Sequence, residues 1–207
     1  MQYKSAERWS PCRFCVIMMV RTMDNELPKR KSIRLKNYDY STAGAYFVTI
    51  CVQGRKRILS EFVGPNDSAV NTTGAFHAVG EDLDPPGMRL KPIGEVVVEQ
   101  LFALEKRFTN VEIKEHVIMP DHIHAIIIIH KVAGGSRPSP TLVDIMRVFK
   151  SLTSRICKQK YGIDRLFQRS YIEHIIRDRE DYEARRKYIR DNPIRWYYER
   201  LSAGEIG

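Results

Sequence analysis

Cysteine is scarce in this sequence, and long apolar runs are missing. Four cysteines in 207 residues are too few and too scattered for a disulfide framework. Cys12 and Cys15 form a C-x-x-C pair, but neither a second pair nor a nearby histidine completes a zinc site. The apolar run at residues 14–20 is too short to cross a bilayer and lacks the cleavage site of a signal peptide. These absences argue against a disulfide scaffold and a membrane partner, and indicate a reduced, cytoplasmic protein.

Acidic residues are in deficit as well. The chain has 25 Asp and Glu against 34 Lys and Arg, which gives a net charge of +9. Its hydrophobic content of 43% and charged content of 29% are those of a globular protein with an ordinary core. The excess of positive charge favours a polyanionic partner, nucleic acid before membrane, although a merely basic surface has the same composition.

The length predicts one domain at residues 28–207. Residues 1–27 are expected to be a flexible leader or to precede the true start. Residues 63–87 are rich in Gly, Pro, Asn and Asp with little periodicity, which predicts an insertion. Residues 28–43 are basic with two tyrosines, a composition that suits phosphate contact and base stacking, or equally a solvated entry segment.

Hydrophobic periodicity predicts an α+β fold with a ferredoxin-like antiparallel sheet covered by helices on one face. We expect strands at residues 45–52, 57–62, 88–91, 111–119 and 122–130, the last two joined by a tight turn at Pro120-Asp121. We expect helices at residues 93–107, 141–161 with Thr141 as cap, 171–178, and 180–191 ending at Asn192-Pro193.

The paired histidines His122 and His124 are the most informative residues. Side chains two apart on a strand point to the same face, so the two imidazoles would form half of a divalent-metal site. They could instead be ordinary histidines with satisfied nitrogens. His130 has the same parity, but at ~3.3 Å per residue it lies roughly 20 Å from His124 and cannot share its metal.

A second segment supplies a nucleophile. On the helix predicted at residues 171–178, Tyr171 and His174 are three apart and share a face. Most of the ten tyrosines of this chain are expected to be packing or surface residues. Tyr171 is a candidate nucleophile only because of the residues around it.

Several of these segments, in this order, resemble the REP-associated tyrosine transposases, which are single-tyrosine nucleases with a His-hydrophobe-His metal motif. The resemblance covers roughly residues 29–198 and departs from the family pattern at Asp121, where Asn is more usual, and at Phe167, where Trp is usual. The matching segments are Arg30-Lys31-Ser32-Ile33-Arg34-Leu35 with Gly44-Ala45-Tyr46-Phe47-Val48-Thr49, then Met119-Pro120-Asp121-His122-Ile123-His124, then Phe167-Gln168-Arg169-Ser170-Tyr171 with Glu173-His174-Ile175-Ile176-Arg177, and a closing motif of Tyr188-Ile189 and Asn192-Pro193-Ile194-Arg195-Trp196.

The resemblance implies a catalytic mechanism. His122, His124 and a third ligand would hold Mg²⁺ or Mn²⁺ against a phosphate of single-stranded DNA. Tyr171, placed on a C-terminal helix, would attack phosphorus and form a covalent 5′-phosphotyrosine. The third ligand would be His174, with Glu173 as its competitor.

The resemblance also implies a substrate and a setting. The substrate would be repeat DNA that folds into hairpins, bound by a monomer or homodimer at the bacterial nucleoid. Two other readings stay open, a binder that no longer cuts and a zinc hydrolase that uses the same histidine pair. The residues expected to contact DNA are Arg30, Lys31, Arg34, Lys36, Arg147, Lys150, Gln168 and Arg169.

Overall fold

The computed structural model describes residues 43–63, 87–131 and 140–204. The predicted leader at residues 1–27 and nearly all of the predicted insertion at residues 63–87 lie outside the described residues. So do four of the predicted DNA contacts, Arg30, Lys31, Arg34 and Lys36. None of the described helices is long and apolar enough to cross a bilayer.

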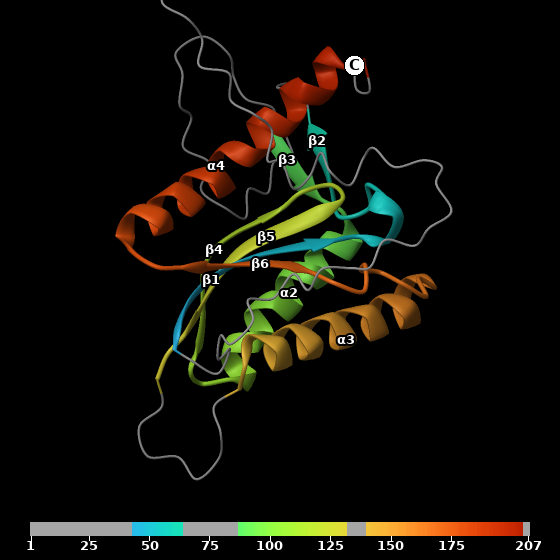
Figure 1. The fold of residues 1–207 in the computed structure, drawn as a ribbon. Helices are drawn as coiled ribbons and strands as arrows, with labels where there is room; N and C mark the ends of the chain where they lie inside the picture. The colour runs from blue at the N-terminus through green and yellow to red at the C-terminus, as the bar shows by residue number, and fades with distance from the viewer. Residues whose placement is uncertain (1–42, 64–86, 132–139, 205–207) are drawn as a thin grey trace, which may run out of the picture. The chain divides into compact units, whose positions relative to one another are not determined.

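A four-stranded antiparallel sheet forms the centre of the fold, as predicted (Figure 1). Its strand order is β4-β5-β1-β6. The histidine strand, β5, pairs with β1 on one side and β4 on the other and is buried almost throughout. The strands are β1 (Gly44–Cys51), β4 (Val111–Ile118), β5 (His122–Ile129) and β6 (Ile172–Ile176).

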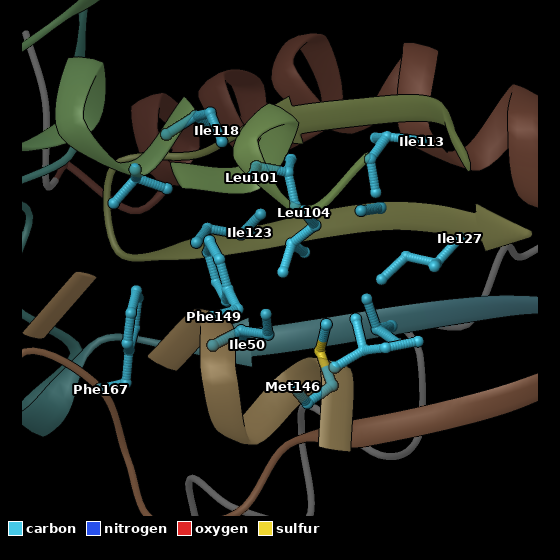
Figure 2. Close-up of a cluster of buried hydrophobic side chains, with 14 of the residues drawn as sticks. Ile50, Leu101, Leu104, Ile113, Ile118, Ile123, Ile127, Met146, Phe149 and Phe167 are labelled. Carbon is cyan, nitrogen blue, oxygen red and sulfur yellow. The ribbon is translucent and has the colours of Figure 1, made fainter. Parts of the chain in front are cut away.

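Two predicted helices cover one face of this sheet. They are α2 (Pro92–Arg107) and α3 (Leu142–Tyr161), and both match the predicted ranges closely. Thr141 caps α3, because its hydroxyl accepts a hydrogen bond from the Asp144 amide while the Asp144 carboxylate accepts one from the Thr141 amide. Between the helices and the sheet lies the main core, which includes Ile50, Leu101, Ile123, Met146 and Phe149 (Figure 2).

The opposite face of the sheet is covered too, which corrects the prediction that helices pack on one face only. Helix α4 (Arg179–Ser202) lies across that face (Figure 1). Phe47, Val117 and Ile126 of the sheet and Ile189 of α4 belong to one buried cluster there. Side chains alternate along β5, so one face packs on α2 and α3 while the other, with both histidines, faces α4.

The predicted helix at residues 171–178 is wrong. Residues Ile172–Ile176 form β6, which pairs antiparallel with the edge of β1. The free edge of β1 offers unpaired backbone groups, and the β-branched residues Ile172, Ile175 and Ile176 suit a strand that satisfies them. A short apolar run cannot be assigned to helix or strand by periodicity alone.

The predicted stop of the last helix at Asn192-Pro193 is also wrong. Helix α4 continues through Pro193 to Ser202. A proline inside a helix costs roughly 3 kcal/mol, because it removes one hydrogen bond and crowds the preceding turn. Packing beyond the proline offsets this cost, since the Trp196 ring stacks on Phe62 with the ring centroids 5.2 Å apart.

Phe62 belongs to a small separate sheet, β2 (Ser60–Val63) paired with β3 (Gly87–Leu90). A single-turn 3-10 helix, η1 (Gln53–Arg55), and a short linker join β1 to β2. The Ser60 hydroxyl donates a hydrogen bond to the Ile118 carbonyl (2.8 Å), and the Leu59 amide donates to the Pro120 carbonyl (3.0 Å). The small sheet is thereby tied to the turn that precedes the histidine pair.

Candidate functional site

The histidine pair sits at the start of β5, directly after the Pro120-Asp121 turn. The Met119 amide donates to the His122 carbonyl (2.9 Å) to close this hairpin, and the Val52 amide donates to the Asp121 carbonyl (2.9 Å). His122 and His124 project from the same face, and their ring centroids are 4.7 Å apart. Their relative exposures are 6% and 3%, so both imidazoles are removed from solvent.

Each imidazole is anchored through its Nδ1 atom. Asp121 Oδ1 lies 2.6 Å from Nδ1 of His122, and Thr49 Oγ1 lies 2.8 Å from Nδ1 of His124. Nε2 of His124 is buried and has no hydrogen-bond partner. Metal-binding histidines usually have one nitrogen anchored in this way while the other binds the metal. The donor set therefore fits a divalent cation.

Burial sets the protonation state of the pair. Loss of solvent lowers the pKa of His124 well below its usual value, and the nearby His122, Arg55 and Arg195 lower it further. Burial also lowers the pKa of His122, against the opposing effect of the Asp121 carboxylate. Both rings are thus neutral near pH 7, the form in which imidazole binds a metal.

A tyrosine from helix α4 packs against this pair. The Tyr188 ring lies edge-on to His124, with the ring centroids 5.1 Å apart. Phe47 stacks on His124 (5.2 Å) and meets Tyr188 edge-on (5.8 Å), so it supports both rings. The guanidinium carbon of Arg195 lies 5.0 Å from the centre of the Tyr188 ring. The sequence predicted a closing motif that contains Tyr188, but no pattern in the sequence indicated that Tyr188 contacts the histidine pair.

Asn192 follows Tyr188 by four residues and therefore lies one turn further along the same side of α4. Its side chain is 6% exposed, and its Oδ1 atom is buried without a hydrogen-bond partner. A buried amide oxygen in this state is a candidate ligand for Mg²⁺ or Mn²⁺, which prefer oxygen donors.

The structure does not bring Tyr171 to the histidine pair. Tyr171 precedes β6 and packs against the core cluster under α2 and α3, with its hydroxyl buried. Glu173 is two residues away on the same side. On a strand, residues three apart point to opposite faces, so Tyr171 and His174 are separated where a helix would have aligned them.

His174 shares the face of the histidine pair but lies away from it. His174 is opposite Phe47 on β1, whereas His124 is opposite Thr49 from the other side. This places the two residues roughly 10 Å apart across the strands and about 7 Å apart along them. The Nε2 atom of His174 is 2.7 Å from Asp181 Oδ2. Within the described ranges, no three His, Cys, Asp or Glu side chains lie close enough to share a metal.

The remaining predicted DNA contacts gather around α3. Lys150 Nζ donates to the carbonyls of Gln168 (2.6 Å) and Arg169 (2.8 Å) and so ties the loop before β6 to α3. Arg147 is 2.5 Å from Asp144 on the same helix. Because α3 and α4 cover opposite faces, the structure does not bring Arg147 or Lys150 together with the histidine pair.

Comparison with known proteins places the chain in a family. The family model for IS200-like transposases matches residues 93–192, from the first turn of α2 to Asn192. An uncharacterised protein of Haemophilus influenzae is 31% identical over 187 residues, which cover 83% of this chain and 92% of that protein.

Two solved structures are similar at low sequence identity. A REP-associated tyrosine transposase bound to a REP hairpin has a TM-score of 0.49 and 17% identity, with 84% of this chain and 76% of that chain covered. A candidate transposase from Deinococcus radiodurans has a TM-score of 0.41 and 13% identity, with 76% and 95% covered. From the family match and the relative that spans nearly its whole length, this chain belongs to the IS200-like transposase family.

Proposed function

We propose that this transposase-family protein is a metal-dependent single-stranded DNA endonuclease and strand transferase whose nucleophile is Tyr188. The observation that supports this most strongly is the packing of Tyr188 against His124, whose Nε2 atom has no hydrogen-bond partner. The tyrosine ring and the nitrogen proposed to bind the metal thus lie next to each other in one chain. Tyr188 replaces Tyr171 as the nucleophile because Tyr171 packs on the other face of the sheet.

His122, His124 and Asn192 would hold the Mg²⁺ or Mn²⁺ ion in this proposal. The two Nδ1 anchors and the buried Asn192 Oδ1 atom fit a site with two nitrogen donors and one oxygen donor. When bound, the ion polarises a phosphate oxygen and neutralises charge in the transition state. His174 and Glu173 are not ligands in this arrangement.

Tyr188 Oη would attack phosphorus, forming a bond to the 5′-phosphate while the bond to the 3′-oxygen breaks. The phenol loses its proton to solvent, and the departing 3′-oxygen gains one. The Arg195 guanidinium, 5.0 Å from the ring centre, stabilises negative charge on the attacking phenol. A phenol with a pKa of ~10 is a better leaving group than a sugar alcohol, so a 3′-hydroxyl can displace it and rejoin strands.

The proposed substrate is hairpin-forming repeat DNA with unpaired flanks. Three observations support it, namely the net charge of +9, the motifs shared with REP-associated tyrosine transposases, and the REP hairpin bound by the similar solved structure. Because Tyr188 packs on the histidines of its own chain, a monomer would suffice for the first cut.

The test is covalent trapping. Wild-type protein is incubated with labelled hairpin DNA and Mn²⁺, and the products are separated on a denaturing gel. We expect a protein–DNA adduct that disappears in Tyr188→Phe and with chelator, but persists in the matched variant Tyr171→Phe. An adduct lost in Tyr171→Phe and kept in Tyr188→Phe would contradict the proposed nucleophile.

Two further outcomes would favour the competing functions. If the wild type retards DNA in a native gel without any adduct, the protein is a non-cleaving binder. If free cleavage product survives both tyrosine substitutions, the histidine pair activates water and the protein is a hydrolase.

A further inference from the structure

Arginines from two distant segments converge beside the histidine pair. Arg55 ends the η1 turn, and its Nη1 atom lies 3.7 Å from Asp121 Oδ2. Arg200 comes from the far end of α4. Trp196, on whose ring Arg200 lies, packs against the buried cluster that contains Met119, three residues before His122. Arg55 is therefore next to the histidine pair, and Arg200 lies on the face of the sheet that carries the pair.

A third arginine joins them through Trp196. The guanidinium carbon of Arg200 lies 4.2 Å from the centre of the Trp196 ring, and that of Arg57 lies 5.4 Å from the same centre. Phe62 stacks on this ring as well, which fixes its plane. Two guanidinium groups on one indole concentrate positive charge at a defined place, where an anion would be stabilised.

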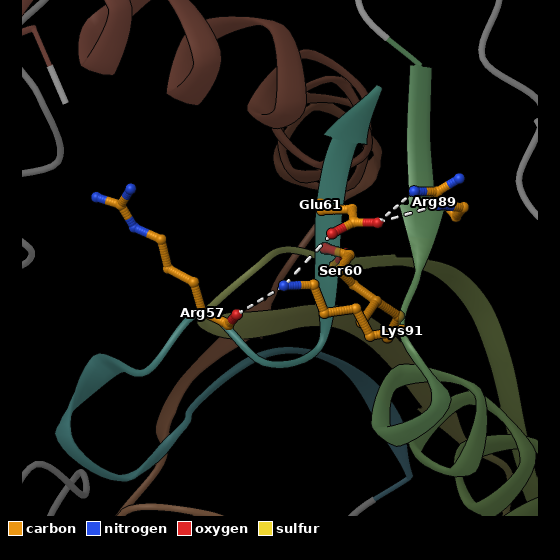
Figure 3. Close-up of polar contacts among 6 residues, drawn as sticks. Arg57, Ser60, Glu61, Arg89 and Lys91 are labelled. Carbon is orange, nitrogen blue, oxygen red and sulfur yellow. Dashed lines mark hydrogen bonds and ion pairs between the residues drawn. The ribbon is translucent and has the colours of Figure 1, made fainter. Parts of the chain in front are cut away.

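A group of charged side chains at β2 and β3 lies next to the backbone of Arg57. Glu61 on β2 is engaged by Arg89, with Nη2 at 2.7 Å, and by Lys91, with Nζ at 3.5 Å. Lys91 Nζ also donates to the Arg57 carbonyl (3.2 Å). Figure 3 shows the Arg57 side chain extending away from this group, so its backbone is anchored while its guanidinium points elsewhere.

Aromatic side chains continue the same surface. Tyr197 packs on Phe62 with the ring centroids 5.3 Å apart, and Tyr198 lies next to it at 5.5 Å. Tyr198 is 37% exposed. Exposed aromatic rings beside arginines are typical of surfaces that bind unpaired nucleotides, whose bases stack while their phosphates meet the positive charges.

We propose that Arg55, Arg57 and Arg200 form an arginine clamp that binds the phosphates of unpaired nucleotides next to the scissile phosphodiester. Trp196 is a positioning residue that holds two of the three guanidinium groups. The clamp rests on the proposed function, since it extends that site. All four residues lie outside residues 93–192, the segment that the family model matches.

The clamp is tested by binding rather than by cleavage. Fluorescence anisotropy of two labelled DNA hairpins, one with a single-stranded tail and one blunt, is measured with chelator present and Tyr188→Phe as the parent protein. We expect Arg200→Gln to weaken binding of the tailed hairpin about tenfold, which one lost charge-assisted contact explains. The slope of log affinity against log salt should fall by about 1, and blunt-hairpin affinity should stay unchanged.

Matched variants make the result specific. Arg107→Gln removes an exposed arginine from the last turn of α2, which covers the other face of the sheet, and should leave both affinities unchanged. Arg200→Lys keeps the charge but not the planar stack on Trp196, and should bind with intermediate affinity. Equal loss on tailed and blunt hairpins, or no loss on either, would overturn the clamp. Neither result affects the covalent adduct, so failure of the clamp is distinct from failure of the proposed function.

Discussion

Thr49 and Asp121 each occupy the Nδ1 atom of one histidine, which leaves Nε2 as the atom that can bind a metal. Neither residue is a proposed ligand. Their effect is to fix the orientation of each ring, and the Asp121 carboxylate would offset the positive charge of the proposed metal ion.

The Thr49 contact can be removed with little change in shape. Thr49→Val deletes the oxygen that bonds His124 and leaves a side chain of similar volume. We expect Mn²⁺ affinity, measured by isothermal titration calorimetry, to fall roughly 10- to 100-fold, as for other residues that orient a metal ligand. Thr153→Val, a buried threonine whose hydroxyl bonds the Phe149 carbonyl within α3, is the control and should keep wild-type affinity. Equal affinities for the two variants would show that Thr49 does not position the ligand.

At the scale of elements, the turn before β5 depends on how closely α2 approaches it. Gly94 stands in the first turn of α2, and a Cβ atom built on it would lie 2.0 Å from the Leu59 carbonyl oxygen. The Leu59 amide bonds the Pro120 carbonyl, so this contact connects α2 to the hairpin that carries the histidines. Only glycine allows such an approach of helix to backbone.

Gly94→Ala is therefore expected to destabilise the protein, even though alanine is the better helix former. The clash forces α2 or residue 59 to move, and the free energy of unfolding should fall by about 1–3 kcal/mol in urea denaturation. Gly44→Ala is the matched control, because a Cβ there would meet nothing closer than 3.8 Å. A Gly94→Ala protein as stable as the wild type would mean that α2 can retreat from the turn without cost.

Helix α4 is the element that completes the site, and a contact outside the site anchors its beginning. Asp178 caps it by accepting a hydrogen bond from the Asp181 amide (2.8 Å). Asp181 in turn binds His174 of β6 and Arg185 of α4. His174, predicted as a metal ligand, thus joins the edge strand to the helix that carries Tyr188.

At the scale of the whole molecule, burial of three histidines links stability to pH. His122 and His124 lie on the face covered by α4, whereas His116 packs on Phe102 of α2. His116, His122 and His124 all have a pKa lowered mainly by burial. In the unfolded state, histidines become protonated as the pH falls through about 6.5, whereas the buried histidines of the folded state stay neutral to lower pH. The unfolded state then binds more protons, so the free energy of unfolding must decrease as the pH falls.

We expect the metal-free protein to lose stability between about pH 7.5 and pH 5.5, before its carboxylates titrate. The limiting slope is about 1.4 kcal/mol per pH unit for each histidine that stays neutral. Urea denaturation at a series of pH values, with chelator present, measures this slope. His116→Phe, which leaves the proposed metal ligands intact, should reduce the slope, and a stability independent of pH over this range would contradict the assignment.

Patterns among neighbouring residues were sufficient to predict two helices and the strand that carries the histidine pair. The period of two on β5 placed His122 and His124 on one face, and the period of 3.6 gave α2 and α3 nearly to the residue, including the Thr141 cap. These features depend on neighbours in sequence, and the structure confirms them. The prediction that His130 lies too far from His124 to share its metal is also confirmed. His130 follows the far end of β5, and its Nε2 atom is 3.0 Å from Glu112 Oε2.

Only the tertiary structure decided which tyrosine meets the histidines. Residues Ile172–Ile176 became a strand because β1 offers a free edge, and that change of element moved Tyr171 and His174 to opposite faces. Helix α4 continued past Pro193 because Trp196 packs on Phe62, and its course brought Tyr188 to His124. The sequence by itself determined that His122 and His124 share one face of a strand. The residues that contact this histidine pair were decided by strand pairing and packing between segments far apart in the chain, which no local pattern encodes.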